Sequence, residues 1–317
     1  MSELRAALAC AGQLEQLCLI DAVPVFDVSP DNYHKLLTLK RLRRLEWSYP
    51  QSDDVQRLLH FFHFPSLVEL DIAVVPGMPD TIDPSILGPN ATLWVEPVEH
   101  RAVPLPDLQT LTLSCLEGST CTLRQCITDK LQHVELIGGM GRLDWVLRDP
   151  RLPHLTHLLL ADIDVDSNNV NALLSYVSQL ESLTLERVTQ VDALLLALYK
   201  TSDTLVQDTF GNVIHLRSMP CPQLKEIILW CCSNVTSEVL MSTVFWRNMA
   251  EWENDLGGAS GSRLGKRADV IIQRPSQITS VRVEGCRGVT PHSSVVSTLH
   301  NLGVQDATVV CGDEGVE

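Results

Sequence analysis

Cysteine and histidine are the residue types in this sequence with the best prospect of chemistry, because both can bind a metal ion. Cys115, Cys121 and Cys126 follow one another closely, with His133 further along the chain. Their spacing does not match the patterns typical of zinc sites. Cys231-Cys232 is an adjacent pair, which is awkward for a simple disulfide. We therefore expect the ten cysteines to be free, mostly buried thiols, with no metal bound.

Other motifs resemble catalytic or phosphate-binding sites only in part. The stretch 257–266 (GGASGSRLGK) lacks the G-x4-G-K-[ST] spacing of a phosphate-binding loop, and Ser260 lacks the glycine frame of a nucleophile elbow. No G-x-G-x-x-G can be completed at 138–141. Two histidine pairs, His60/His63 and His154/His157, have no third ligand nearby in the sequence. We expect no enzyme activity and no cofactor.

The composition narrows the classes of partner. The chain has 317 residues and a net charge of −15, from 24 Lys and Arg against 39 Asp and Glu. Such a chain is a poor binder of nucleic acids or anionic membranes, which attract Lys and Arg. No apolar run is long enough for a transmembrane helix, and the first residues do not read as a signal peptide. We expect a cytoplasmic or nuclear protein.

A short pattern, repeated along most of the chain, indicates which elements position these residues. It consists of an aliphatic residue, two variable residues, a second aliphatic, one variable residue and a third aliphatic. Most of its starts lie 23 to 28 residues apart, within the range of leucine-rich repeats. The occurrences are Leu14/Leu17/Leu19, Leu42/Leu45/Trp47, Leu67/Leu70/Ile72, Leu108/Leu111/Leu113, Leu131/Val134/Leu136, Leu155/Leu158/Leu160, Leu180/Leu183/Leu185, Leu224/Ile227/Leu229, Ile278/Val281/Val283 and a weaker Val304/Ala307/Val309.

Each unit is predicted to contain a strand, a turn and a helix. Prolines 65, 106, 153 and 222 all stand two residues before a first aliphatic, where a turn should precede the strand. Helical spacing follows in 168–179, 190–200 and 237–246, with Ser167 as a candidate N-cap. The longer gaps hold either a degenerate unit, as at 205–210, or an insertion.

The predicted fold is a single α/β solenoid over residues 1–317. It has about nine or ten repeats, parallel strands on a concave face and helices on a convex face. We expect residues 248–275 to form a flexible insertion loop within it.

Two units resemble leucine-rich repeats of the cysteine-containing type. In Leu229–Thr236 and Val283–Thr290, a cysteine stands three residues after the last aliphatic and a Val-Thr pair follows. The wider similarity is to the repeat region of fungal F-box/leucine-rich-repeat proteins. That resemblance implies presentation of substrates to a Skp–cullin ubiquitin ligase. Only 13 residues precede the first repeat, so we expect no F-box within this sequence and a Skp-type partner only if an F-box is encoded upstream.

The variable positions of the strands should form the binding face. Their acidic members outnumber the basic ones by eight to two, with Arg44 and Arg282 the basic pair, which favours a protein partner with a basic surface. His133 and His157 occupy outward positions and could make binding sensitive to pH. The residues that we predict to contact the partner are Glu135, His157, Leu159, Glu186, Glu226, Ile228, Trp230, Arg282 and Glu284.

The function expected from the sequence is therefore protein recognition. The first hypothesis is the substrate-binding repeat region of an F-box-like ubiquitin ligase adaptor. A repeat-only scaffold without a ligase role is the second. A third is a regulator that clamps an enzyme such as a GTPase or a nuclease.

Overall fold

The computed structural model describes the residues that carry nearly all of the predicted repeats. These residues are 2–20, 37–48, 62–73, 103–114, 126–139, 152–165, 167, 170–207, 213–249, 270–289 and 293–310. Every structural statement below concerns these ranges.

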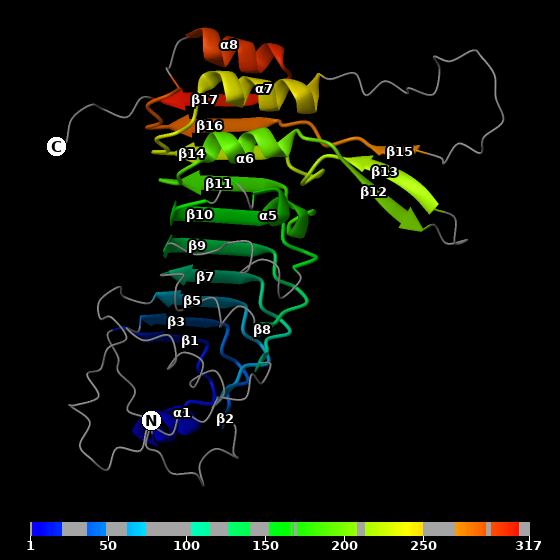
Figure 1. The fold of residues 1–317 in the computed structure, drawn as a ribbon. Coiled ribbons are helices and arrows are strands. Elements are labelled where there is room, and N and C mark those ends of the chain that lie inside the picture. Colours follow the sequence, from blue (N-terminus) through cyan, green and yellow to red (C-terminus); the bar gives the residue numbers. More distant parts are fainter. Residues whose placement is uncertain are drawn as a thin grey trace, which may run out of the picture. The chain divides into compact units, whose positions relative to one another are not determined.

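The main element is a parallel sheet of ten short strands whose order follows the sequence (Figure 1). All ten predicted strands are confirmed, and the fold is α/β and consistent with a leucine-rich-repeat-like solenoid. The strands are β1 (Gln16–Leu19), β3 (Arg44–Ser48), β5 (Glu69–Ala73), β7 (Thr110–Ser114), β9 (His133–Gly139), β10 (His157–Ile163), β11 (Ser182–Glu186), β14 (Glu226–Trp230), β16 (Ser280–Glu284) and β17 (Asp306–Val310).

The aliphatic pattern specifies these strands because alternate side chains of a strand point to opposite faces. In β14, Ile227 and Leu229 are fully buried, whereas Glu226, Ile228 and Trp230 are partly exposed. The first aliphatic of this unit, Leu224, is buried in the preceding turn. The strands from β3 to β16 repeat the arrangement, with three buried apolar residues in each repeat, whereas the inward residues of the end strands β1 and β17 are only partly buried.

The chain divides into two compact units, and the first comprises Met1–Leu155. It contains β1, β3, β5, β7 and β9, paired through Leu17↔Leu45 and the equivalent positions of later strands. The turns before these strands pair as well. β2 (Leu37–Thr38) lies beside β4 (Phe62–His63), and β6 (Val103–Pro104) lies beside β8 (Cys126–Ile127).

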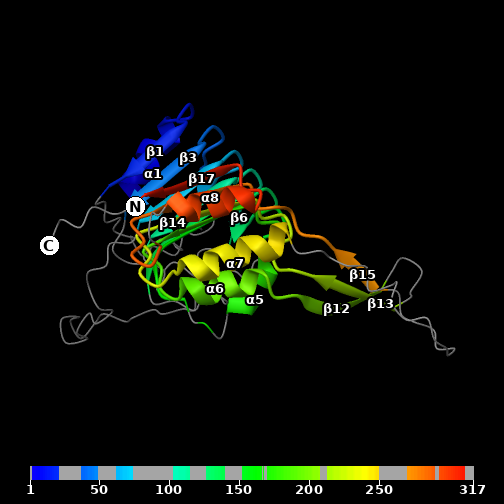
Figure 2. The same cartoon turned by 90° about the horizontal axis from the view of Figure 1, so that it is seen from above.

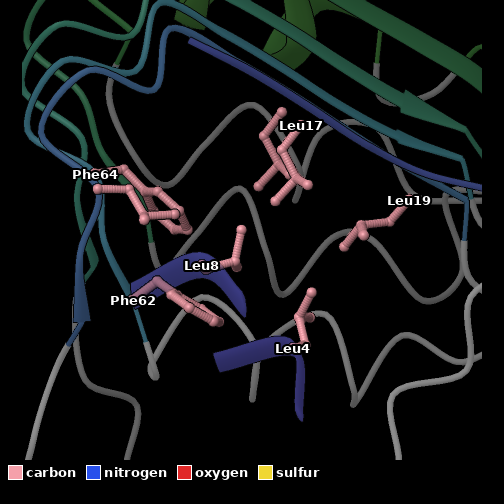
Figure 3. A pocket seen from close by; sticks show the side chains of 8 residues that line it. Leu4, Leu8, Leu17, Leu19, Phe62 and Phe64 are labelled. Carbon is pink, nitrogen blue, oxygen red and sulfur yellow. The ribbon is translucent and has the colours of Figure 1, made fainter. Parts of the chain in front are cut away.

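A helix that the repeat pattern did not predict, α1 (Ser2–Cys10), precedes β1. Leu4 and Leu8 of α1 face Leu17, Leu19 and the phenylalanines of β4 and the turn after it (Figure 3). All the side chains that line the space between α1 and these residues are leucine or phenylalanine. A solenoid exposes apolar core at its ends unless a capping element covers it, and α1 covers the core beside β1.

The second unit, Thr156–Glu317, contains β10, β11, β14, β16 and β17 together with four helices. The helices are α5 (Val170–Tyr176), α6 (Val191–Leu198), α7 (Ser237–Asn248) and α8 (Ser293–Asn301). α5, α6 and α7 lie together on one side of the strands (Figure 2), and the three helical predictions in this unit are confirmed. No described helix is long and apolar enough to span a lipid bilayer.

A left-handed residue recurs at one position of successive units. Gly138, Asp162, Arg187, Cys231 and Gly285 have φ between 49° and 70°. Each directly follows the last outward residue of its strand, and the backbone N–H of the last three donates to a carbonyl of the next strand, as from Cys231 to Glu284 at 2.8 Å. Only two of the five are glycine, the residue that adopts this conformation most easily.

The gap between β11 and β14 holds an insertion, not a degenerate repeat. β12 (Ser202–Gln207) and β13 (Val213–Ser218) form an antiparallel hairpin, and β15 (Val270–Gln273) pairs with β13 in parallel. This three-stranded sheet is separate from the ten-stranded one. The predicted insertion at 248–275 therefore contributes a strand, while its residues 250–269 lie outside the described residues.

Candidate protein-binding face

The residues at the outward register positions of unit 2 form three rows across its five strands, and of these Ala161 and Ser182 are buried by their neighbours. We call this surface the open face. The register aligns His157, Ser182, Glu226, Ser280 and Asp306 in the first row. Leu159, Thr184, Ile228, Arg282 and Thr308 form the second row, and Ala161, Glu186, Trp230, Glu284 and Val310 the third.

The structure brings eight of the nine predicted contact residues together on the open face. They are His157, Leu159, Glu186, Glu226, Ile228, Trp230, Arg282 and Glu284. The ninth, Glu135, lies on β9 of unit 1. His133 and His157, considered as a pH-sensitive pair, likewise belong to different units.

Trp230 and Arg282 are the centre of the open face. The Arg282 guanidinium lies over the Trp230 ring, 5.8 Å from its centroid, and donates to Glu284 at 3.2 Å. Trp230 itself is half-buried, and its indole Nε1 is buried without a hydrogen-bond partner. Ile228 precedes it on the same face. A large aromatic ring held beneath an arginine resembles the anchor residues of protein interfaces.

The carboxylate of Glu226 is held by serines of both neighbouring strands. Ser182 donates to one oxygen at 2.6 Å, and Ser280 donates to the other at 3.3 Å. The side chain is therefore oriented by the face itself. Two of its lone pairs are therefore used before any partner arrives.

Glu186 belongs to a second charged group at the edge of the face. Arg187 hydrogen-bonds Glu186 and also donates to both carboxylate oxygens of Asp162, at 2.5 and 2.6 Å. These bonds lower the pKa of Asp162 and raise that of Arg187. The three residues together carry one net negative charge, the same as Glu186 alone, so Asp162 and Arg187 leave the acidic excess of the outward positions unchanged.

Unit 1 has its own row of outward acids, formed by Glu46, Asp71 and Glu135 with Thr112 between the last two. Glu135 accepts hydrogen bonds from His133 at 3.0 Å and from Thr112 at 3.3 Å, and the histidine contact lowers its pKa. Asp71 is different, because desolvation and the charges of Glu46 and Glu135 raise its pKa. Asp71 is thus the carboxylate of this row whose charge costs stability.

Replacing Asp71 with asparagine is therefore expected to stabilise the protein at pH 7, by about 0.5 kcal/mol. Because the folded-state pKa of Asp71 is raised, the native protein loses stability as the pH rises through the interval above about 3.8. The gain from Asp71→Asn should disappear below that interval. Urea unfolding at several pH values measures it, and Asp129→Asn, an exposed change in the same unit, is the control. A gain that persisted at pH 3 would contradict this explanation.

The cysteines whose side chains are described are all free thiols, namely Cys10, Cys18, Cys221, Cys231, Cys232 and Cys286. Within the described ranges, no three His, Cys, Asp or Glu side chains form a metal-binding group. Cys115, Cys121, His60, Ser260 and the stretch 257–266 lie outside these ranges.

Sequence reasoning missed an apolar ridge on the outer side of α7. Phe245, Trp246 and Met249 are 44%, 47% and 49% exposed, and Trp246 stacks on Tyr199 with ring centroids 6.4 Å apart. The opposite side of α7 buries Leu240 and Val244. A second apolar stripe at i, i+1 and i+4 was readable in the sequence, but only burial shows that it faces outward.

No protein-family model matches the sequence, and no curated protein matches it significantly. The fold class and the open face therefore rest on the repeat pattern and on the geometry described above.

Proposed function

We propose that the chain is a protein-recognition scaffold that binds its partner on the open face. The observation that carries the proposal is the grouping around β14. Ile228 and Trp230 offer apolar surface, Arg282 covers the indole, and the carboxylates of Glu186 and Glu284 stand on either side of Trp230. An apolar centre with a polar rim is the usual anatomy of a protein interface.

The partner that this surface fits carries an apolar side chain flanked by Lys or Arg. The apolar group would lie against Ile228 and Trp230, and the cations would approach Glu186, Glu226 or Asp306. Because Glu284 is paired with Arg282 and Glu186 with Arg187, the attraction is moderate and acts mainly on the rate of encounter. The proposal includes no catalytic step and no cofactor.

For the cellular role, we propose the substrate-binding repeat region of an F-box-like ubiquitin ligase adaptor. The support comes from the two cysteine-containing units. Cys232 and Cys286 are buried, as the repeat pattern requires, and Thr236 caps α7 by accepting from the backbone N–H of Val239. A scaffold or a regulator, for example of a GTPase, that has the same repeats and no ligase role is the alternative.

One experiment separates these roles. The protein is immunoprecipitated from its own cells, and its N-terminal peptide and its companions are identified by mass spectrometry. A chain that begins upstream of Met1 and brings down Skp and cullin supports the ligase adaptor. A chain that begins at Met1 and brings down another protein without them contradicts it and supports the scaffold.

The open face itself is tested by a matched pair of tryptophan substitutions. Trp230→Ala is expected to weaken binding of the captured partner at least tenfold, because it removes the central aromatic anchor. Trp246→Ala removes an equally large side chain from α7 and should leave the affinity unchanged. Titration calorimetry or surface plasmon resonance gives both affinities, and thermal melting confirms that each variant is folded. Equal affinities for the two variants would rule out the open face as the binding surface.

A further inference from the structure

Three cysteines lie close together in the turns that follow the strands of two neighbouring repeats. Cys231 and Cys232 follow β14, and Cys286 follows β16. The register Trp230↔Glu284, continued by two residues, aligns Cys232 with Cys286. The backbone N–H of Cys232 donates to the sulfur of Cys286 at 3.3 Å, so the two thiols occupy equivalent positions in adjacent units and are in contact.

The two buried thiols are not equivalent in charge. The Cys232 thiol donates to the backbone oxygens of Leu185 and Trp230, both at 3.4 Å, and the Cys286 thiol donates to those of Leu229 at 3.7 Å and Glu284 at 3.6 Å. The contact between the two thiols lowers the pKa of Cys232 and raises the pKa of Cys286. Cys232 is therefore the more readily ionised of the two buried thiols.

The backbone geometry permits a disulfide between them. Neighbouring strands of a sheet lie roughly 4.7–4.9 Å apart. The Cα atoms of natural disulfides are roughly 4.4–6.8 Å apart. A registered pair just beyond the ends of two parallel strands falls within that interval.

Cys231 is the thiol of this cluster that a reagent in solution can reach. It is exposed, and its left-handed backbone turns it away from the core. Its sulfur lies against Gly285, only 2.9 Å from where a Cβ of that residue would stand. Gly285 directly precedes Cys286, so the absence of its side chain leaves the exposed sulfur next to the buried pair.

We propose that Cys232 and Cys286 are a reversible oxidation site. Low-molecular-weight disulfides convert the two thiols into a disulfide bond between neighbouring repeats, and the exposed Cys231 is the thiol that reacts with the small disulfide first. The Cys231 thiolate attacks one sulfur of the small disulfide, forms a mixed disulfide and releases one small thiol. A buried thiolate then attacks the mixed disulfide as the turn opens, and the second small thiol leaves. The other buried thiolate then attacks the buried sulfur of the new Cys231 disulfide, which forms the Cys232–Cys286 bond and releases the Cys231 thiol. In sum, two protein thiols and one small disulfide give one protein disulfide and two small thiols.

This site is independent of the proposed function, because its chemistry requires no partner. It nevertheless lies two residues beyond Trp230 and Glu284 on the open face. The disulfide bond would link the turns of two adjacent repeats directly beside Trp230.

Oxidised glutathione is the probe. The folded full-length protein is incubated with it, free thiols are alkylated, and tryptic peptides are analysed without reduction. Cleavage after Lys225, Arg247, Arg282 and Arg287 should give peptides 226–247 and 283–287. We expect these two peptides joined, with the loss of two hydrogens, and separated again by dithiothreitol.

Variants assign the sulfur atoms. Cys231→Ser should slow the crosslink about tenfold and leave its final yield unchanged, whereas Cys286→Ser should abolish it. Cys10→Ser, which removes another exposed thiol in α1, should change neither the rate nor the yield. Stable glutathione on Cys231 with no crosslink would overturn the proposal. So would fragmentation of the joined peptides of the unmodified protein that finds the alkyl group on Cys232 and the disulfide bond on Cys231. Circular dichroism confirms that the buried serine variants fold.

Discussion

Gly288→Ala is expected to lower the free energy of unfolding by about 3 kcal/mol, although Gly288 is exposed. A Cβ at this position would stand 2.0 Å from the carbonyl oxygen of Val235 and 3.1 Å from its carbonyl carbon. Both obstacles are backbone atoms, which no rotamer change can move. Val235 directly precedes the N-cap of α7, so the substitution would push two neighbouring units apart at the start of a helix.

Gly12→Ala is the matched control for this prediction. Gly12 is also exposed, and a Cβ there would meet nothing within 4 Å. We expect a change within about 0.5 kcal/mol. Equilibrium unfolding in urea measures both variants, and similar small changes for the two would show that the turns of adjacent units can separate at no cost.

Arg247→Met is expected to cost about 3 kcal/mol as well, for a different reason. Arg247 is 2% exposed and has no carboxylate partner among the described residues. Its guanidinium donates to the backbone oxygens of Leu198 and Pro220 at 3.0 Å and of Cys221 at 2.8 Å. Leu198 is the last residue of α6, so one side chain joins the end of that helix to the turn before β14. Methionine fills the space and leaves these carbonyls without that donor.

Two further substitutions isolate the role of the guanidinium. Arg247→Lys keeps a cation but cannot reach three carbonyls from one nitrogen, so it should recover only part of the lost stability. Arg287→Met removes an exposed arginine from the same unit and should have an effect within about 0.5 kcal/mol. If Arg247→Lys were as stable as the unmodified protein, charge rather than the three-carbonyl geometry would explain the residue.

The strands and helices of the repeats could be predicted because each repeat contains the complete aliphatic pattern within its own sequence. Leu224, Ile227 and Leu229 define a strand without reference to any other part of the chain, and the other units do the same. α1 and the β12–β13–β15 sheet escaped prediction because neither belongs to the repeat. The pairing of β13 with β15 joins segments that α7 and β14 separate in the sequence, and such non-local pairing leaves no periodic signal.

The composition of the open face was predictable, but its internal bonding was not. The outward positions follow from the alternation of each strand. The serines that hold Glu226 lie 44 and 54 residues away in the sequence, distances set by the inserted segments between strands. Asp162, Arg187 and Cys231 adopt a left-handed conformation that only glycine would have indicated in advance. The burial of Arg247 could not be predicted from the sequence. Arginine is rarely buried, so the general expectation is an exposed side chain.

The β12–β13–β15 sheet also determines how unit 2 would respond to mechanical force. Strands that neighbour one another in chain order can peel from a solenoid singly when its ends are pulled. Here β13 precedes β14 and α7, and β15 follows them, so the pairing of β13 with β15 closes a loop around that repeat. We call this β13–β15 pairing the clasp. Tension along the chain would act on the clasp before it acted on β14. The enclosed repeat would be shielded until the clasp ruptured, and it would then be released together with the clasp in one long extension.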